Sequence, residues 1–545
     1  ITWAKDTDST VIATLDLPNL ATNQFFGQDV DMTADWLVVG VASDNLRGAN
    51  SGAVYVYRKL AGVWTPHSRL MPQYGAPGDL FGQAVSVHGN RIIVAAPGAD
   101  GFPTTVSNAG AFHVFEFNGT QWAETVFVTS PNAVVNGAFA ASVDLQGDVL
   151  VVGATGENGN RGRAYAYRNL TTFASPIALN IPAASVGSVT GHSVSVFDPA
   201  AGTPNNEVIA IGARNESAGQ GAAYVLSGSS FATITTLVDP APAANGFFGH
   251  SVSLDGSQVA VGAPAEGSPS GRVIVFSGSG YTTTSSLSRP SGAALFGFDV
   301  HLSGNSLVAG APGTATNAGA TYVFNFSGGT WSEFGSLNPG DLVTGDGLGS
   351  SVTQFAGQYL ASAIGDDANS IANSVAAFVF SAAPVVTVSP PTPAVSAAGT
   401  TTDSFTVSLN QAPSNNVTIP LTFPAQVQVD SGSGFGASPQ TVTLTPANAV
   451  GGVTVVVRAI DDAIAEANPH AATVETGASS SADSRFNGLT VNDVSVNIAD
   501  NDVAGITVDP TAGLVTTEAG GAATFTVVLT SQPSAEVTLG LSSSD

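Results

Sequence analysis

Cysteine is absent from the 545 residues, and charge is scarce, since only 10% of the residues are charged. Without cysteine the chain forms no disulfide and uses no thiolate chemistry. No apolar run approaches the ~20 residues that a membrane-spanning helix needs, so we expect no membrane insertion. Acidic residues outnumber lysines and arginines by 40 to 14, which gives a net charge of −26. Such a surface repels phosphate backbones and anionic lipids, so nucleic acid is disfavoured as a partner and divalent cations remain candidates.

Turn-forming and β-branched residues are plentiful instead. The chain contains 62 glycines and 30 prolines, together with many valines, threonines, serines and alanines. Glycine and proline punctuate strands, and β-branched side chains suit pleated surfaces, so we expect an all-β protein with almost no helix. The chain opens on Ile1 without a basic, signal-like start, and we expect it to be a piece of something longer.

One pattern returns seven times at a period of ~50 residues, which is typical of a repeat architecture. An aromatic-glycine pair precedes a short strand, an apolar strand ends in a small-residue turn such as "VVGVA" or "AVGAP", and a third strand begins with small residues, as in "GAVYVY". The pairs are Phe26-Gly27, Phe81-Gly82, Phe139-Ala140, Thr190-Gly191, Phe248-Gly249, Phe296-Gly297 and Leu348-Gly349. Several copies continue into a fourth strand that contains tryptophan. Four short antiparallel strands, apolar on both faces and repeated seven times, predict a seven-bladed β-propeller.

These residues resemble the FG-GAP repeats of the integrin α-chain propeller and of many bacterial secreted proteins. The resemblance covers residues 1–380, and copies three, four and seven depart from it at Ala140, Thr190 and the "ASAIG" turn. The segment around Trp3 is similar to the fourth strand of other copies, whereas the seventh copy has no such strand after Phe380. We therefore expect the N-terminal strand to complete the last blade and close the ring.

The pattern changes after residue 380. Alternating strands such as "GGVTVVVRAI" predict a β-sandwich over residues 381–502. The segment 503–545 repeats the beginning of that sandwich, because "ATFTVVLTSQPSAEVTLGL" matches "DSFTVSLNQAPSNNVTIPL". A half domain cannot bury its own faces. Either the gene product continues beyond residue 545, or another molecule supplies the missing strands by β-augmentation and the protein polymerises.

This region resembles the Calx-β domain of sodium/calcium exchangers and of tandem arrays in bacterial surface proteins. The resemblance rests on the opening strand "TEAGGAATFTV", the turn "AIDDAIAEANPH" and the closing "IADND", and it implies calcium bound by acidic residues at one end of the sandwich. The first copy lacks the opening glutamate, which is Ala398 here. The metal ligands that it implies are Asp461, Asp462, Glu466, Asp500 and Asp502, with Glu518 in the second copy.

The propeller part offers weaker candidate sites. Its loops lack the spacing of an Asp-rich calcium loop, so Asp44 and Asp100 are expected to be solvated acids, with weak binding of an ion as the alternative. The histidines show no metal-ligand spacing. Asp29 and Asp299 share a repeat position and form the best acid pair for a propeller hydrolase, but no base or nucleophile accompanies them. Four further residues share the position after the aromatic-glycine pair and are expected at one rim or on the channel wall, satisfying the backbone or binding a ligand: Gln28, Gln83, His192 and His250.

The combined pattern predicts a non-catalytic adhesion or recognition protein outside the cell or at its surface. The propeller would present loops to a protein or glycan ligand, on sandwich repeats stabilised by Ca²⁺. A structural subunit of an extracellular filament or surface layer is the alternative, and a propeller hydrolase is a third, less favoured one.

Overall fold

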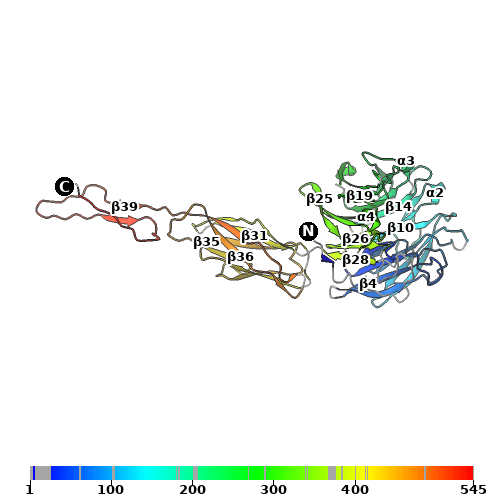
Figure 1. The fold of residues 1–545 in the computed structure, drawn as a ribbon, viewed down its shortest axis with the longest axis horizontal. Coiled ribbons are helices and arrows are strands. Elements are labelled where there is room, and N and C mark those ends of the chain that lie inside the picture. Colours follow the sequence, from blue (N-terminus) through cyan, green and yellow to red (C-terminus); the bar gives the residue numbers. More distant parts are fainter. Residues whose placement is uncertain are drawn as a thin grey trace. The chain divides into compact units, whose positions relative to one another are not determined.

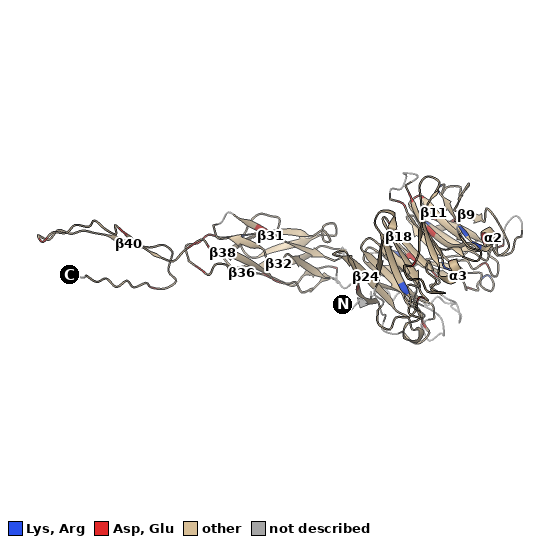
Figure 2. Ribbon diagram, turned by 90° about the horizontal axis from the view of Figure 1, so that it is seen from above, with Lys and Arg blue, Asp and Glu red and all other residues tan. Residues whose placement is uncertain are grey.

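The computed structural model divides into two compact units, residues 1–382 and 383–545, and each is described by itself (Figure 1). The structure describes residues 4–5, 26–60, 63–100, 105–179, 181, 184–199, 206–267, 269–287, 290–337, 339, 342–365, 376–381, 385–398, 401–410, 413, 415–483 and 486–543. Charged residues are sparse along the ribbon in Figure 2, as the composition predicts.

The first unit consists of seven four-stranded antiparallel sheets among its described residues. The first three sheets run β2 (Val30–Met32), β3 (Trp36–Val41), β4 (Ala53–Leu60), β5 (Val63–Leu70); β6 (Val85–His88), β7 (Arg91–Ala96), β8 (Ala111–Phe117), β9 (Trp122–Thr129); and β10 (Phe139–Gln146), β11 (Val149–Ala154), β12 (Arg163–Tyr167), β13 (Ile177–Leu179). The next three run β14 (Thr190–Phe197), β15 (Val208–Ala213), β16 (Ala222–Ser227), β17 (Thr233–Leu237); β18 (Ser251–Asp255), β19 (Gln258–Ala263), β20 (Arg272–Ser277), β21 (Thr283–Ser286); and β22 (Val300–Ser303), β23 (Ser306–Gly310), β24 (Thr321–Ser327), β25 (Thr330–Leu337). The seventh comprises β26 (Leu348–Phe355), β27 (Gln358–Ala363), β28 (Ala376–Ser381) and β1 (Ala4–Lys5).

Each sheet is covered on both faces by its neighbours, because seven buried clusters lie between consecutive sheets. The last cluster joins Val39 and Tyr57 of the first sheet to Leu360 and Val379 of the seventh. The apolar character of the second and third strands on both faces is explained by this double burial. The sheets therefore close into a propeller-like ring.

The glycine that leads the third strand in the first six copies is required by the approach of the next sheet. Gly52 forms a parallel β-bridge with Phe81, and a Cβ on Gly52 would lie 1.9 Å from the carbonyl oxygen of Phe81. Thr190 and Leu348 occupy the same bridge position in their copies. Ala140, which replaces the glycine of the third copy, adopts φ 64° in the left-handed region. The degenerate copies thus keep the backbone geometry of the repeat.

The N-terminal segment lies at the edge of the seventh sheet. Ala4 pairs with Ser381 and Lys5 pairs with Phe380 in antiparallel register. Trp3, on which the closure prediction was centred, lies outside the described residues. The pairing of β1 with β28 gives the seventh sheet its fourth strand from the opposite end of the unit.

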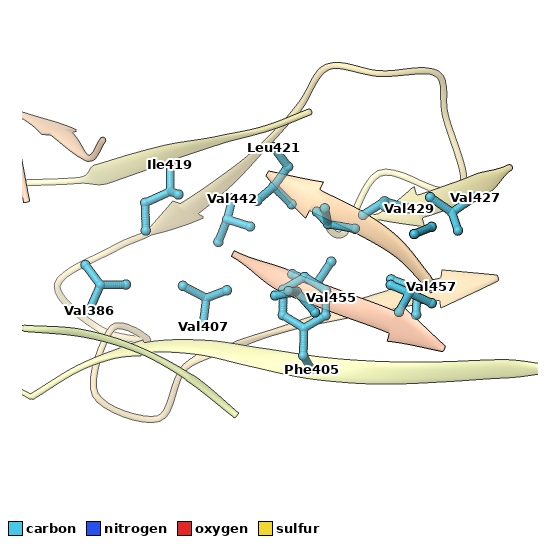
Figure 3. Close-up of a cluster of buried hydrophobic side chains, with 14 of the residues drawn as sticks. Val386, Phe405, Val407, Ile419, Leu421, Val427, Val429, Val442, Val455 and Val457 are labelled. Carbon is cyan, nitrogen blue, oxygen red and sulfur yellow. The ribbon is translucent and has the colours of Figure 1, made fainter. Parts of the chain in front are cut away.

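The second unit contains two sheets that face one another across a buried cluster of valines, Phe405 and other apolar residues (Figure 3). One sheet is ordered β29 (Val386–Ser389), β31 (Thr402–Leu409), β35 (Val453–Ala459), β33 (Val427–Asp430). The other is ordered β30 (Ala394–Ser396), β38 (Val494–Ala499), β36 (His470–Thr476), β32 (Val417–Thr422), β34 (Gln440–Leu444), with β37 (Ser480–Ser481) beside β32. Their strands alternate buried and less buried residues, as half-buried strands do.

A separate hairpin follows, made of β39 (Ile506–Asp509) and β40 (Thr526–Leu529). Ile506 pairs with Leu529 just as Val386 pairs with Leu409, and all four pairs of the hairpin are displaced by 120 residues from those of β29 and β31. Phe525 is 44% exposed, whereas its equivalent Phe405 is 1% exposed. The hairpin therefore repeats the start of the sandwich with its apolar face uncovered.

Helix is confined to short turns within the described residues. These are α2 (Glu157–Asn160), α3 (Glu216–Gly219), α4 (Thr314–Asn317) and the 3₁₀ turn η1 (Ser279–Tyr281). In the described part of the chain, no helix has the length and apolar character to span a membrane. The prediction of an all-β protein is confirmed.

Candidate functional site

The first strands of all seven sheets line a central cavity of about 340 Å³. A second cavity of about 240 Å³ is lined by residues at the beginnings of the same strands, next to the aromatic-glycine pairs. Side chains alternate along each first strand, so valines and leucines enter the cores between sheets and polar residues face the channel. The repeat thus builds a polar channel from seven equivalent strands.

Among the described residues, five aspartates line the larger cavity. Its lining includes Asp29, Asp31, Asp144, Asp255 and Asp299, and none of its described lining residues is a lysine or an arginine. Burial raises the pKa of Asp29 and of Asp31 to about 7, and repulsion from Asp299 and Asp144, respectively, adds to the rise. Burial also raises the pKa of Asp144 to about 6 and shifts the pKa of Asp299 upward.

Each of these carboxylates is an acceptor between neighbouring sheets. An Asp29 oxygen accepts the backbone N–H of Val85 at 2.8 Å, and an Asp299 oxygen accepts that of Val352 at 2.8 Å. The equivalent serines act in the same way, because Ser251 accepts from Val300 at 3.1 Å and Ser351 accepts from Val30 at 3.2 Å. In these four copies the residue at this repeat position therefore binds the first strand of the next sheet.

A second tier of acceptors lies two residues further along the strands. Here the side chain accepts a backbone N–H from the next first strand in five consecutive junctions, from the first sheet to the sixth. The pairs are Asp31 with Val87 at 2.8 Å, Ser86 with Leu145 at 3.1 Å, Asp144 with Val196 at 2.7 Å, Ser195 with Leu254 at 3.0 Å and Ser253 with Leu302 at 2.9 Å. We call the two tiers together the channel relay. The first strand of each sheet is an edge strand, so some of its N–H groups have no partner within the sheet. The channel relay supplies acceptors for them.

The acid pair considered for a hydrolase belongs to this relay. Both oxygens of Asp29 hold donors, from Val85 and from the hydroxyl of Ser351 at 3.0 Å. Both oxygens of Asp299 do so as well, from Val352 and from the hydroxyl of Ser251 at 2.8 Å. What the arrangement does chemically is hold adjacent sheets together, because each acid accepts a backbone N–H from the next first strand.

The four residues that share the position after the aromatic-glycine pair all line the smaller cavity: Gln28, Gln83, His192 and His250. The rings of His192 and His250 lie edge to face with centroids 4.9 Å apart, and Phe298 lies 4.7 Å from His250. Burial lowers the pKa of His192 to about 2 and that of His250 to about 4, with further lowering by the positive charge of Arg214. Both imidazoles are therefore neutral at physiological pH.

The loop acid Asp44 is a buried structural residue rather than a solvated one. It is 1% exposed, pairs with Arg69, and accepts the Tyr55 hydroxyl at 3.3 Å and the Leu46 N–H at 2.9 Å. The expectation of a solvated acid at Asp44 is corrected by these partners, which compensate for the burial of its charge. Asp100 accepts the Asn108 N–H at 3.0 Å within an exposed loop.

A related structural acid was not found by sequence reasoning. Glu157, in the loop of the third copy, is fully buried and binds the hydroxyls of Ser130 and Tyr165, both at 2.5 Å. Glu266 lies in the corresponding loop of the fifth copy, and its carboxylate accepts the N–H of Ala243 at 3.1 Å. The signal available in the sequence was an acidic residue a few positions after the second strand in most copies. These acids, which lie between the second and third strands of a sheet, thus bind the loop that connects the preceding sheet to their own.

The structure brings part of the expected calcium site together. Asp461 and Asp462 follow β35, and Asp500 and Asp502 follow β38. Desolvation raises the pKa of Asp502, and repulsion from Asp500, Asp461 and Asp462 adds to the rise, so these four carboxylates share one neighbourhood. Backbone N–H donors lower the pKa of Asp500, and the first of them is that of Glu466 at 2.7 Å.

The other two predicted calcium ligands, Glu466 and Glu518, do not complete a metal site with these aspartates. The Glu466 carboxylate contacts Gln426 at 2.7 Å and His470 at 3.0 Å, and Glu518 lies in the separate hairpin segment. Within the described residues, no three His, Asp or Glu side chains are arranged so as to share one metal ion. Carboxylates and backbone oxygens are nevertheless the ligands that Ca²⁺ prefers. The calcium site stays a prediction.

Comparison with known proteins bears on the first sheets. The family model described as FG-GAP repeat matches residues 11–57 and 64–115. No curated protein matches the chain. The matched segments include the aromatic-glycine pairs at Phe26 and Phe81 and the glycine-led third strands of the first two sheets. The chain is therefore an all-β, propeller-like protein with FG-GAP repeats in two places.

Proposed function

We propose that the chain is a non-catalytic adhesion or recognition protein of the cell exterior or cell surface. In this proposal residues 1–380 are a seven-bladed FG-GAP β-propeller that presents binding loops. Residues 381–502 are a Calx-β-like sandwich, and residues 503–545 are the first half of another. The seven shared cores support the blade count, and the 120-residue displacement of β29 and β31 onto β39 and β40 supports the tandem sandwiches.

The observation that carries the recognition function is a set of exposed apolar residues on loops between sheets and, at Leu46, on a loop within the first sheet. In antiparallel sheets of this order, the loop that enters the first strand and the loop between the second and third strands lie at the same edge. That edge carries uncovered apolar side chains in several copies: Tyr74 at 84%, Val135 at 66%, Val186 at 66%, Leu46 at 54% and Val343 at 50% exposed. Exposed apolar side chains on the loops of a rigid scaffold are suited to contact a partner, because binding removes them from water.

The channel relay supports binding over catalysis. A general acid or base needs a proton-accepting atom that is available to a substrate. The oxygens of Asp29 and Asp299 already hold backbone and serine donors, and these bonds connect neighbouring sheets. Variable loops on a rigid ring of sheets suit recognition, because loops change without affecting the scaffold.

The test is adhesion of the full chain to immobilised glycans and extracellular proteins, with Tyr74→Asp and Leu46→Asp as variants. We expect saturable binding that both substitutions weaken, because a charge enters the apolar loop surface. Leu60→Asp is the matched control, since Leu60 is 50% exposed but lies at the opposite edge, beside the β4–β5 hairpin. Equal loss in all three variants, or no binding at all, contradicts the proposal.

A second candidate, a subunit of an extracellular filament or layer, is favoured by the uncovered face of β39 and β40. Val527 is 37% exposed and its equivalent Val407 is fully buried, so this face lacks the cover that the complete sandwich provides. Electron microscopy of the concentrated chain would show an ordered polymer if copies cover this face. Phe525→Asp should then abolish the polymer, while Thr526→Asp, which lies on the alternate face of the strand, should not.

A further inference from the structure

We propose that the smaller cavity is a binding site for a neutral, hydroxylated ligand of the size of a single sugar ring. The inference rests on the proposed recognition function and deepens it by naming the ligand class and its place. The cavity lies at the edge of the sheets that carries the exposed apolar loops, because its lining residues begin the first strands. A ligand that enters there is therefore next to the surface proposed for recognition.

One side of the cavity offers free amide groups. Gln28 and Gln83 are half-buried, and among the described residues neither side chain has a hydrogen-bond partner, although the backbone N–H groups of both are bonded. A primary amide both donates and accepts, so two of them can bind adjacent hydroxyl groups. Half-buried amides normally find partners, and these two face a space where a ligand can supply them.

The other side of the cavity is an aromatic wall. His192, His250 and Phe298 contact one another in succession, edge to face and then tilted, with centroids 4.9 Å and 4.7 Å apart. The Nδ1 of His250 lies 2.9 Å from the carbonyl oxygen of Phe298 and therefore donates to it, which leaves Nε2 of that neutral ring as an acceptor. Such a wall provides apolar ring surface together with a hydrogen-bonding edge.

The floor of the cavity is polar. Asp29 and Asp299 line both cavities, so their carboxylates lie between the smaller cavity and the channel. In this structure both Asp29 oxygens already hold donors, so the carboxylate forms a polar floor held in place by the channel relay, and the hydrogen bonds to the ligand come from the amides and from His250.

The lining selects against other ligand classes. No lysine or arginine is among the described lining residues, and Arg214, whose charge acts on His192 and His250, is not one of them, so an anion finds no direct ion-pair partner in the lining. The described histidines and acids form no group of three that can share a metal ion. Ligand pockets for drug-sized molecules occupy about 300–1,000 Å³, and the cavity of about 240 Å³ is smaller. Amides, an aromatic wall and a polar floor in that volume fit a monosaccharide.

The test is saturation-transfer NMR and calorimetric titration of the full chain with glucose, galactose, mannose and N-acetylglucosamine. We expect saturable binding of at least one of them. Gln83→Leu should weaken it at least tenfold, because an amide partner is lost. Ala141→Phe should do the same by filling the cavity, since Ala141 lines it without contributing a polar side-chain atom. Gln121→Leu, on the exposed turn before β9, is the matched control and should bind as the wild type does.

The outcomes separate this site from the proposed function. If no sugar binds but the full chain still adheres to extracellular proteins, the inference is overturned and the recognition function stands. If a sugar binds and the chain adheres to nothing, the site stands and the recognition function fails. Binding that persists in both Gln83→Leu and Ala141→Phe, with melting temperatures equal to that of the wild type, also overturns the site.

Discussion

The hydroxyl oxygen of Ser351 accepts the backbone N–H of Val30 at 3.2 Å, although 321 positions separate the two residues. Ser351 belongs to the seventh sheet and Val30 to the first, so this bond joins the ends of the ring. The same hydroxyl donates to Asp29 at 3.0 Å. The last junction is therefore closed by the channel relay that connects the other sheets.

Ser351→Ala should destabilise the first unit by about 1–3 kcal/mol, because the buried N–H of Val30 and a carboxylate oxygen of Asp29 lose their partner. Urea unfolding followed by tryptophan fluorescence measures it, since all five tryptophans lie in the first 382 residues. Ser350→Ala is the control, because among the described residues the Ser350 hydroxyl bonds only to the nearby Gly347 carbonyl, at 2.7 Å. Equal effects of the two substitutions would contradict a role for the ring-closing bond.

Stability of the first unit should depend on pH through Asp31. Burial raises its pKa in the folded state to about 7, so its contribution is fully present below the unfolded value near 3.8 and is lost as pH rises through about 7. Asp31→Asn keeps an acceptor oxygen but does not titrate. When the pH is lowered from 8 to 5, the free energy of unfolding of the wild type should increase by roughly 2 kcal/mol relative to that of the variant.

The comparison with Asp31→Asn is needed because histidines act in the opposite direction. The pKa values of His192 and His250 are lowered by burial, so their contribution is lost as pH falls below about 6.5. Both proteins carry these histidines, and their effect cancels in the difference. A difference that stays constant from pH 5 to pH 8 would show that Asp31 does not titrate in this range.

Gly52→Ala should destabilise the first unit by about 3 kcal/mol or more, because the new Cβ would lie 1.9 Å from the Phe81 carbonyl oxygen of the next sheet. Gly89→Ala is the matched control. Gly89 also has a positive φ, +59°, but a Cβ added there would have no atom within 4 Å, so only the left-handed backbone cost of about 1 kcal/mol applies. Chemical denaturation of both variants tests whether the approach of neighbouring sheets explains the repeated glycine.

Calcium should raise the melting temperature of the second unit if the acidic residues after β35 and β38 bind it. Selective binding to the folded state adds about 2.7 kcal/mol at a calcium concentration one hundred times the dissociation constant. Asp500→Asn and Asp502→Asn should reduce the shift, while Asp493→Asn, which bonds to Thr476, should leave it unchanged. Calorimetry is the suitable measurement, because this unit contains no tryptophan. An unchanged melting temperature would contradict the predicted calcium site.

Much of the secondary structure follows from the sequence. The aromatic-glycine pair, the apolar second strand and the glycine-led third strand mark most of the sheets, because strand periodicity and turn chemistry are local properties. The shared repeat position of Gln28, Gln83, His192 and His250 also indicated that they lie together, and the structure places all four at one cavity. Equivalent positions in a repeat meet around its axis whatever residues they carry.

The roles of Asp29, Asp44 and Glu157 were decided only by tertiary structure. Each is bound by partners from another strand or another sheet, and the sequence around each acid is the same whether it is solvated or buried. The sequence by itself determined where strands and turns occur, because those depend on neighbouring residues. Tertiary structure decided which polar groups are used up in holding the sheets together, because hydrogen bonds between sheets join residues that are distant along the chain.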